Sequence, residues 1–251
     1  MKTLNPTDVH KFLDEKIVKL YESQIEALRE IKLNTILGNR NPYFLAFSGV
    51  ASVPDLIQDA LDDFLFPIEQ DLLGDFLKDL AVFMASKTCD GHKSTAPGVD
   101  LEFFNSGVHY VVSVKSGTNW GNSSQQKKLE EDLRNAVIRV RQSKHGANIQ
   151  SILGICYGKT KTSYVRGYLK VAGQNFWYLI SENEALYTDI IEPIGYRAKQ
   201  HNETFLKEKS RVINRFTKQF IDKFCDDTGD IDWVKLVEFN SGNYDLDKFL
   251  S

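Results

Sequence analysis

The sequence predicts an α/β fold in which a central mixed β-sheet is flanked by helices, with further helices added at the N- and C-terminal ends. Two observations lead to this prediction. The spacing of apolar residues changes from helical to alternating at residue 98, and a helical segment then separates two apolar strands. A helix between strands returns the chain to a parallel neighbour. Helices before and after the sheet can cover both of its faces.

The N-terminal part of the chain has helical spacing. Residues 7–33 place apolar side chains three and four positions apart behind a Thr7 cap. A second helix is expected to start near Ser52, and a third after Pro67, because proline is favoured in the first turn of a helix. Residues 1–66 are therefore expected to form a helical N-terminal part.

Residues 98–115 have the pattern of a β-hairpin, since β-branched and aromatic residues flank a turn-forming Asn105-Ser106-Gly107. The absence of repeats and of Pro/Gly-rich linkers favours one domain over 1–251, with its core at 67–180 and a mainly helical C-terminal part at 181–251. The other expected elements are a helix from Ser124 to about Gln142, a strand at 151–157, a strand at 164–170 beside it, and helices at about 182–191 and 197–224.

Composition is that of an ordinary globular protein, with 42% hydrophobic and 26% charged residues. Cys89, Cys156 and Cys225 are far apart, so neither a zinc site nor a disulfide framework is indicated. The sequence has no signal-peptide pattern and no apolar run long enough to span a membrane. We expect a cytoplasmic protein without membrane contact.

The net charge of −3 hides an asymmetry along the chain. Residues 103–178 contain eleven Lys and Arg against three acids, whereas the remainder is acidic. A basic middle segment can provide a local phosphate-binding surface, and it favours a nucleic-acid partner.

Four polar residues of the hairpin predict a chemical site. Residues two apart in a strand share a face, so Asp100 and Glu102 are expected to project together, as are Ser113 and Lys115 on the partner strand. Two carboxylates can hold Mg²⁺, which polarises a phosphoryl oxygen and activates water. A lysine can orient that water or neutralise charge in the transition state. The set suits Mg²⁺-dependent phosphodiester hydrolysis, with no organic cofactor.

Pro97-Gly98-Val99-Asp100 and Ser113-Val114-Lys115, with twelve residues between Asp100 and Ser113, resemble the PD-(D/E)xK nuclease superfamily, and within it the type II restriction endonucleases. The stretch 116–125 is similar to the loop that follows the lysine in some of these enzymes, and the resemblance extends over about 67–240. It implies that Asp100 binds the metal and that Lys115 is the catalytic lysine.

The superfamily's second acid normally occupies position 113, where this chain has serine. Some restriction enzymes of the superfamily also have serine there and recruit a glutamate from the following helix, which would make Glu130 or Glu131 the ligand. Glu102 is the alternative that we favour, because it is expected on the correct face. Glu69 resembles the upstream helical glutamate that often occurs in these enzymes.

Polar and basic residues after the site are candidates for DNA contact. The helix after Lys115 and the connection near Gly158 are rich in Lys and Arg, which suit phosphate contacts, although a solvated helix face is the alternative for part of the set. Amides can pair with adenine in the major groove, or they can stabilise turns. The DNA-binding candidates are Asn119, Trp120, Asn122, Gln125, Lys127, Lys128, Lys159, Lys161 and Arg166.

The sequence thus predicts a Mg²⁺-dependent type II restriction endonuclease that cuts double-stranded DNA within a short specific site. A palindromic target would require two active sites related by two-fold symmetry, hence a homodimer. One alternative is a repair, mobile-element or defence nuclease with loose specificity. The other is a DNA-binding module that has lost catalysis, which a serine at position 113 would permit.

Overall fold

A computed structural model describes residues 2–38, 40–50 and 52–250. Contacts divide the chain into two compact units. Unit 1 comprises Met1–Leu20 and Asp71–Lys199, and unit 2 comprises Tyr21–Gln70 and Gln200–Ser251. Three long helices, α1 (Pro6–Glu30), α4 (Val53–Thr88) and α8 (Ile191–Phe224), contribute residues to both. Among the described residues, no helix has the length and apolar character needed to cross a membrane.

Unit 1 contains a six-stranded mixed sheet, which confirms the predicted α/β class. The strand order is β1-β2-β3-β4-β6-β5. Strand β3 pairs antiparallel with β2 and parallel with β4, as the hairpin and the intervening helix predicted. The strands are β1 (His92–Lys93), β2 (Leu101–Asn105), β3 (Val108–Lys115), β4 (Asn148–Ile155), β5 (Ser163–Val165) and β6 (Tyr168–Ala172).

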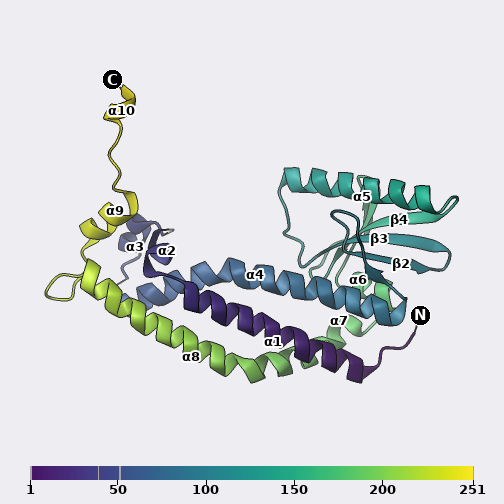
Figure 1. Cartoon of the computed structure of the whole chain (residues 1–251), viewed down its shortest axis with the longest axis horizontal. Coiled ribbons are helices and arrows are strands. Elements are labelled where there is room, and N and C mark those ends of the chain that lie inside the picture. Colours follow the sequence, from purple (N-terminus) through teal and green to yellow (C-terminus); the bar gives the residue numbers. More distant parts are fainter. Residues whose placement is uncertain (1, 39, 51, 251) are drawn as a thin grey trace. The chain divides into compact units, whose positions relative to one another are not determined.

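Helices cover both faces of this sheet (Figure 1). Helix α5 (Ser123–Ser143) lies on one face, where Leu129 and Leu133 pack with Val111 and Leu153 of the strands. On the other face lie the C-terminal half of α4 and helix α6 (Gln174–Ser181), with Phe176 of α6 packed directly against Gly154. The apolar side chains of β3 and β4 point alternately towards α5 and towards the helices on the other face, because successive residues of a strand point to opposite faces of the sheet.

Helix α5 starts earlier than the sequence predicted. Asn122, not Ser124, is its N-cap, and its side chain accepts hydrogen bonds from the backbone N–H groups of Ser124 and Gln125. The Gln125 side chain accepts from the N–H of Asn122 in return. This reciprocal arrangement is a capping box, in which asparagine is as good a cap as serine.

Helix α4 is continuous, so the prediction of two helices divided at Pro67 was wrong. An internal proline removes one helical hydrogen bond and disfavours the helix by about 3 kcal/mol. Residues on both sides of it are buried, with Leu61 and Leu65 in the core of unit 2 and Leu80 and Met84 buried in the unit 1 part of the helix. Burial of each such side chain contributes about 1.5–3 kcal/mol, so packing outweighs the proline.

The segment expected as one strand at 164–170 forms the hairpin β5–β6, with Arg166 and Gly167 as its two turn residues. Helix α6 precedes the long C-terminal helix and the short α9 (Trp233–Ser241) follows it, and neither was expected from the sequence. A short apolar helix such as α6 has no long periodic pattern to reveal it. Helix α7 (Leu186–Asp189) occupies part of the expected 182–191 helix.

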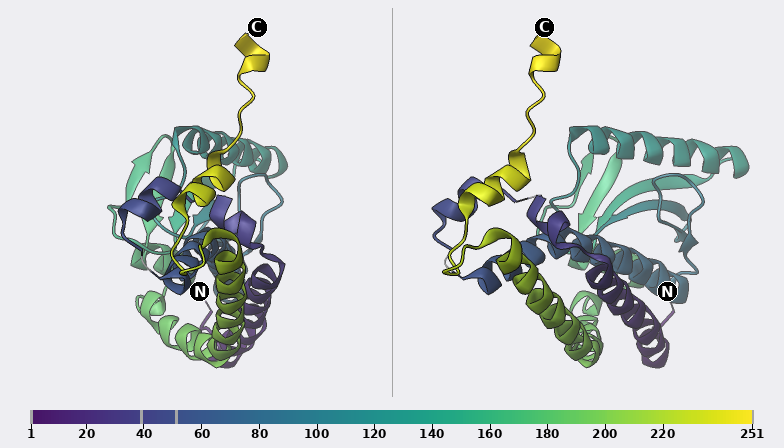
Figure 2. Two further views of the ribbon diagram at one scale, coloured as in Figure 1. Left: turned by 90° about the vertical axis from the view of Figure 1, so that its left-hand side faces the viewer. Right: turned by 60° about the vertical axis from the view of Figure 1, so that its left-hand side comes forward.

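Unit 2 is helical. Besides parts of the long helices it contains α2 (Leu33–Gly38), α3 (Pro42–Phe47), α9 and α10 (Asp247–Leu250). Its core joins the N-terminal half of α4 to the end of α8, where Phe216, Phe220 and Phe224 are buried. After α9 the chain extends away from that helix and ends in α10 (Figure 2).

Candidate active site

Asp100 lies immediately before β2 and is anchored to β3. Its backbone N–H donates to the carbonyl of Val112 at 2.9 Å, and its Oδ2 accepts from the N–H of Val114 at 2.6 Å. The carboxylate of Asp100 is therefore held beside the last residues of β3. Its hydrogen-bond partner Val114 directly precedes Lys115 in the chain. The predicted juxtaposition of Asp100 with the Ser113-Val114-Lys115 strand end is present in the structure.

Ser113 and Lys115 line a cavity of about 330 Å³ between the end of β3 and the first turns of α5. Ser113 is 1% exposed, and its hydroxyl has no hydrogen-bond partner within the described residues. A buried hydroxyl without a partner is costly, so it indicates a place where water or a ligand atom completes the site. The cavity is lined by Gly98, Ser113, Lys115, Trp120, Gly121, Gln125, Lys128, Leu129 and Asp132.

Asp132 brings a second carboxylate into this cavity. It lies on α5, is 9% exposed, and forms an ion pair with Lys128 at 2.8 Å. Its side chain packs on Gly98, where a Cβ would lie 2.3 Å from Asp132 Oδ2. Gly98 also has a φ of +71°, a conformation that favours glycine. The glycine thus lets the helical carboxylate approach the segment that ends in Asp100.

Asp132 was not among the site residues expected from the sequence, although its place in the helical pattern distinguishes it. Of the three consecutive acids on α5, Asp132 alone shares a helical face with the buried Leu129, Leu133 and Ala136. Residues three and four apart lie on one face of a helix. An acid within the apolar stripe is therefore the one that turns towards the sheet.

The charge of Lys115 responds to both carboxylates. Burial lowers the pKa of its ammonium group below the usual value, and the positive charge of Lys78 acts in the same direction. Asp100 and Asp132 oppose that shift, so both lie close enough to Lys115 to affect its ionisation. The ammonium also lies 5.3 Å from the centroid of the Trp120 ring, within reach of a cation–π contact.

Helix α4 supplies a further lysine, Lys78, which was not among the residues expected from the sequence. Lys78 hydrogen-bonds to Asp75 at 3.0 Å, and Asp75, Asp100 and Asp71 raise its pKa against the effect of burial. Gly74 lies one turn earlier, and a Cβ there would be 3.7 Å from the hydroxyl of Ser116. This part of α4 therefore borders the end of β3.

Glu102 lies away from Lys115, in a hydrogen-bonded group of its own. The hydroxyl of Ser94 donates to its Oε1 at 2.5 Å, and His109 Nε2 lies 3.1 Å from its Oε2. Lys144 Nζ lies 3.5 Å from the other ring nitrogen of His109. Glu102 and Lys115 line different cavities.

Strand direction explains this separation. Glu102 pairs with Val111, so Lys115 is four residues further along β3, about 13 Å at roughly 3.3 Å per residue. Because β2 and β3 are antiparallel, the step from Asp100 to Glu102 leads towards the hairpin turn, whereas the step from Ser113 to Lys115 leads away from it. A shared face therefore does not bring Glu102 to the lysine.

We expect Glu102→Gln to lower the free energy of unfolding at pH 7 by about 1–3 kcal/mol, because the network loses its negative charge and one of the two oxygens that accept from Ser94 and His109. Burial alone would raise the pKa of the Glu102 carboxyl, but hydrogen bonds from Ser94 and His109 hold it below its ordinary value of 4.5. The contribution is then complete above pH 4.5 and is lost as the pH falls through the lowered pKa. Urea unfolding at pH 7 and in acid measures both effects.

The matched control for this variant is Glu131→Gln, since Glu131 is exposed on α5. It should leave stability within about 0.5 kcal/mol of the wild type. A Glu102→Gln protein as stable as this control at pH 7 would contradict the structural role of the network.

The other acids considered from sequence lie elsewhere. Glu130 pairs with Arg134 at 2.9 Å and lines a pocket that does not include Lys115. Glu131 is exposed. Glu69 belongs to unit 2, where its charge contributes, after burial, to a raised pKa of Tyr21.

The polar loop after β3 divides into structural and exposed residues. Asn122 and Gln125 form the capping box of α5, and Gln125 also borders the cavity of Lys115. Trp120 is half-buried beneath the lysine, whereas Asn119 is exposed. Asn119 is therefore an exposed member of the predicted base-reading set that takes no part in the capping box.

The basic candidates all have exposed side chains: Lys127, Lys128, Lys159, Lys161 and Arg166. Lys159 and Lys161 lie on the connection after β4, which packs against the loop after β3. A Cβ on Gly158 would lie 2.5 Å from Thr118, and one on Gly117 would lie 2.5 Å from the ring of Tyr157. These close approaches place two of the lysines beside the loop that borders the active-site cavity.

The donor set fits a magnesium ion. Asp100 and Asp132 provide hard carboxylate oxygens, and the Ser113 hydroxyl provides a buried polar atom that has no hydrogen-bond partner among the residues that the structure describes. No group of three or more His, Cys, Asp or Glu positioned to hold a metal occurs within the described residues. Magnesium needs no such group, because it is commonly held by one or two carboxylates with water and substrate phosphate.

Comparison with known proteins identifies the family of the chain. Residues 7–202 match the family model described as type II restriction endonuclease EcoO109I. No curated protein matches the chain. The matched range includes the whole sheet, Asp100, Lys115 and Asp132. The chain therefore belongs to the EcoO109I family of type II restriction endonucleases.

Proposed function

We propose that this protein is a Mg²⁺-dependent endonuclease that cuts double-stranded DNA within a short specific sequence, and that Asp100, Asp132 and Lys115 form its catalytic centre. The observation that carries the proposal is the position of Asp132. It packs on Gly98, two residues before Asp100, and it shares a cavity with Lys115. The acid that is missing at position 113 is thus replaced from α5.

Each residue has a separate task in this proposal. Asp100 and Asp132 would hold the magnesium ion, which supplies Lewis-acid polarisation of the scissile phosphate and a lowered pKa of the attacking water. Lys115 orients that water and neutralises negative charge as it develops on the phosphate. Ser113 offers its hydroxyl to a water in the cavity. Trp120 shields one side of the ammonium from solvent.

DNA is the substrate class that suits the surroundings of the site. The side chains of Lys159, Lys161 and Asn119 are exposed on the two loops that pack together beside the cavity. Lysines can contact phosphates to hold the register of the duplex, and an exposed amide can read a base edge. A restriction enzyme that acts on DNA within the cell would be cytoplasmic.

We infer a homodimer from the symmetry of the target. A short palindrome presents two equivalent phosphates, and one chain has one set of Asp100, Asp132 and Lys115. Exposed aromatic side chains on α3 of unit 2, Phe44 at 61% and Phe47 at 87%, are available for an interface. Large apolar side chains of this kind are enriched where proteins associate.

The purified chain should cut plasmid DNA into discrete fragments with Mg²⁺, and EDTA should abolish the cutting, because two carboxylates and a lysine cannot activate water without the ion. Gel electrophoresis gives the fragments, and sedimentation of the same sample should show a dimer. A smear of products would support loose specificity instead. Binding of DNA without any cleavage would support a DNA-binding module. Cleavage in the presence of EDTA would contradict the proposed dependence on Mg²⁺.

A further inference from the structure

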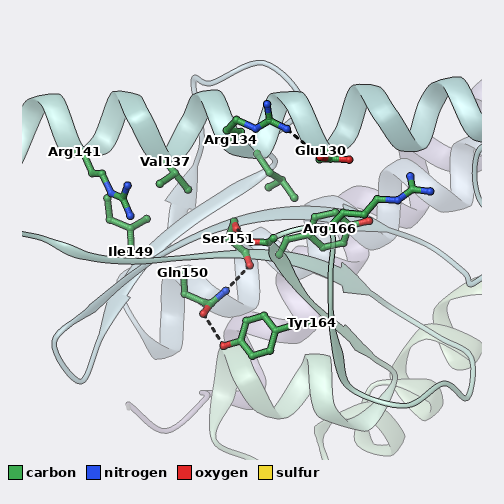
Figure 3. Close-up of a pocket in the computed structure, with 12 residues that line it drawn as sticks. Glu130, Arg134, Val137, Arg141, Ile149, Gln150, Ser151, Tyr164 and Arg166 are labelled. Atoms are coloured by element: carbon green, nitrogen blue, oxygen red, sulfur yellow. Dashed lines mark hydrogen bonds and ion pairs between the residues drawn. The ribbon is translucent and has the colours of Figure 1, made fainter.

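We propose that a pocket between α5 and the β5–β6 hairpin binds the phosphate backbone of DNA outside the catalytic cavity. The inference rests on the proposed DNA substrate but concerns residues that the catalytic centre does not use. The pocket has a volume of about 270 Å³ and contains three arginines, Arg134, Arg141 and Arg166. We call it the arginine pocket (Figure 3).

The arginine pocket has an excess of positive charge. Its one acidic lining residue, Glu130, is paired with Arg134 at 2.9 Å. The guanidinium groups of Arg141 and Arg166 make no hydrogen bond or ion pair with any residue in the described part of the chain, and both side chains are exposed. Two planar cations with unused donors are suited to phosphate oxygens, which they can bind in a bidentate manner.

The spacing of the arginines favours an extended polyanion over a single phosphate ion. Arg134 and Arg141 are seven residues apart on the same side of α5, about 10 Å along the helix axis at roughly 1.5 Å per residue. Figure 3 shows Arg141 and Arg166 at opposite ends of the pocket, with Gln150 and Ser151 between them. A DNA strand, which presents successive phosphates, can engage both ends at once.

The floor of the pocket is held in place by its own hydrogen bonds. The Tyr164 hydroxyl donates to Gln150 Oε1 at 3.0 Å, and Gln150 Nε2 donates to the carbonyl of Ser151 at 2.8 Å. The Tyr164 ring is nevertheless 71% exposed. These contacts occupy Gln150 and Tyr164 and leave the guanidinium groups of Arg141 and Arg166 available to a ligand.

Arg166 stands in a backbone conformation that disfavours arginine. It and Gly167 are the two central residues of the β5–β6 turn, with φ values of +49° and +89°. A two-residue hairpin turn with positive φ at both positions prefers Asn, Asp or Gly at the first. An unfavourable residue at such a position points to a function of its side chain. Phosphate contact provides that function.

The test compares binding of random-sequence duplex DNA without divalent metal across a range of salt concentrations. In Arg141→Gln/Arg166→Asn, the slope of log affinity against log salt should become shallower by about two, since each lost phosphate contact removes about one. Asparagine suits the turn, so Arg166→Asn should not lower the melting temperature. The matched control is Arg139→Gln, because Arg139 donates to Thr95 and lines a different cavity of the same helix.

The control should keep the wild-type slope. An unchanged slope in the double variant would overturn the proposal, and so would an equal loss in Arg139→Gln. If the double variant fails to fold, Arg141→Gln alone should still reduce the slope by about one. The readout is binding without metal. If the double variant has a shallower salt slope but the wild type never cuts DNA, the arginine pocket is supported and the proposed catalysis is contradicted. If the wild type cuts DNA but the double variant has an unchanged slope, the catalysis is supported and the arginine pocket is contradicted.

Discussion

Asp132→Asn should slow DNA cleavage by about 10³-fold, because it removes one of the two carboxylates proposed to hold the magnesium ion while keeping the size of the side chain. Asp132 is nearly buried against Gly98, so no neighbouring acid on α5 can take its place. Single-turnover cleavage of plasmid DNA measures the rate, and binding of the same DNA without divalent metal should be retained.

Glu131→Gln, one residue earlier on the helix, is the matched control and should cut at the wild-type rate, because Glu131 is exposed. Glu102→Gln should also retain cleavage at a pH and temperature where it is folded. Full activity in Asp132→Asn together with loss of activity in Glu102→Gln would contradict the proposal and identify Glu102 of β2 as the second metal ligand. A readout independent of catalysis is the pKa of Lys115, which should fall in Asp132→Asn because a charge that raises it is removed.

Lys115→Met should reduce cleavage by roughly the same factor, about 10³-fold, because the water and the developing charge lose their cation. Methionine retains the apolar stem against Trp120, so the change isolates the ammonium group. Lys115→Arg should not restore the activity, since a planar guanidinium cannot occupy the position of a compact ammonium. The measurement is the single-turnover rate at saturating Mg²⁺.

Burial lowers the pKa of Lys115, so this residue should lose its proton at a lower pH than an ordinary lysine. Because the proposed role of Lys115 needs its charged form, the cleavage rate of the wild type should begin to fall at a lower alkaline pH than it would if the catalytic lysine were exposed. Lys11→Met, a change of an exposed lysine on α1, serves as the control for cleavage chemistry. Equal cleavage rates in Lys115→Met and the wild type would contradict the proposed catalytic role of Lys115.

Local sequence patterns were sufficient for β2, β3 and β4 of the sheet and for the position of Asp100 beside the end of β3. The β-hairpin, the helix after it and the buried strand β4 each have a clear period, and a hairpin joined to a crossover helix admits few arrangements. Pairing of Leu101 with Val112 follows from the two-residue turn at Ser106 and Gly107. Such features depend on residues that are near each other along the chain.

Tertiary packing decided the features that local patterns misrepresented. Pro67 indicated a helix boundary, yet buried leucines on both sides keep α4 continuous. Glu102 was expected beside Lys115 because both share a face of the hairpin. Distance along an antiparallel pair also matters, and it places Glu102 with His109. The arginine at the β5–β6 turn gave no signal of a turn at all.

The sequence alone thus determined the α/β class, the hairpin and the neighbourhood of Asp100 and Lys115, because each is set by short-range periodicity and strand register. It did not determine which acid lines the cavity of Lys115. That choice depends on how α5 rotates against the sheet, and the rotation is set by the packing of Leu129 and Leu133 on Val111 and Leu153. The same packing turns Asp132 onto Gly98 and turns Glu130 towards the arginine pocket, on another side of the helix.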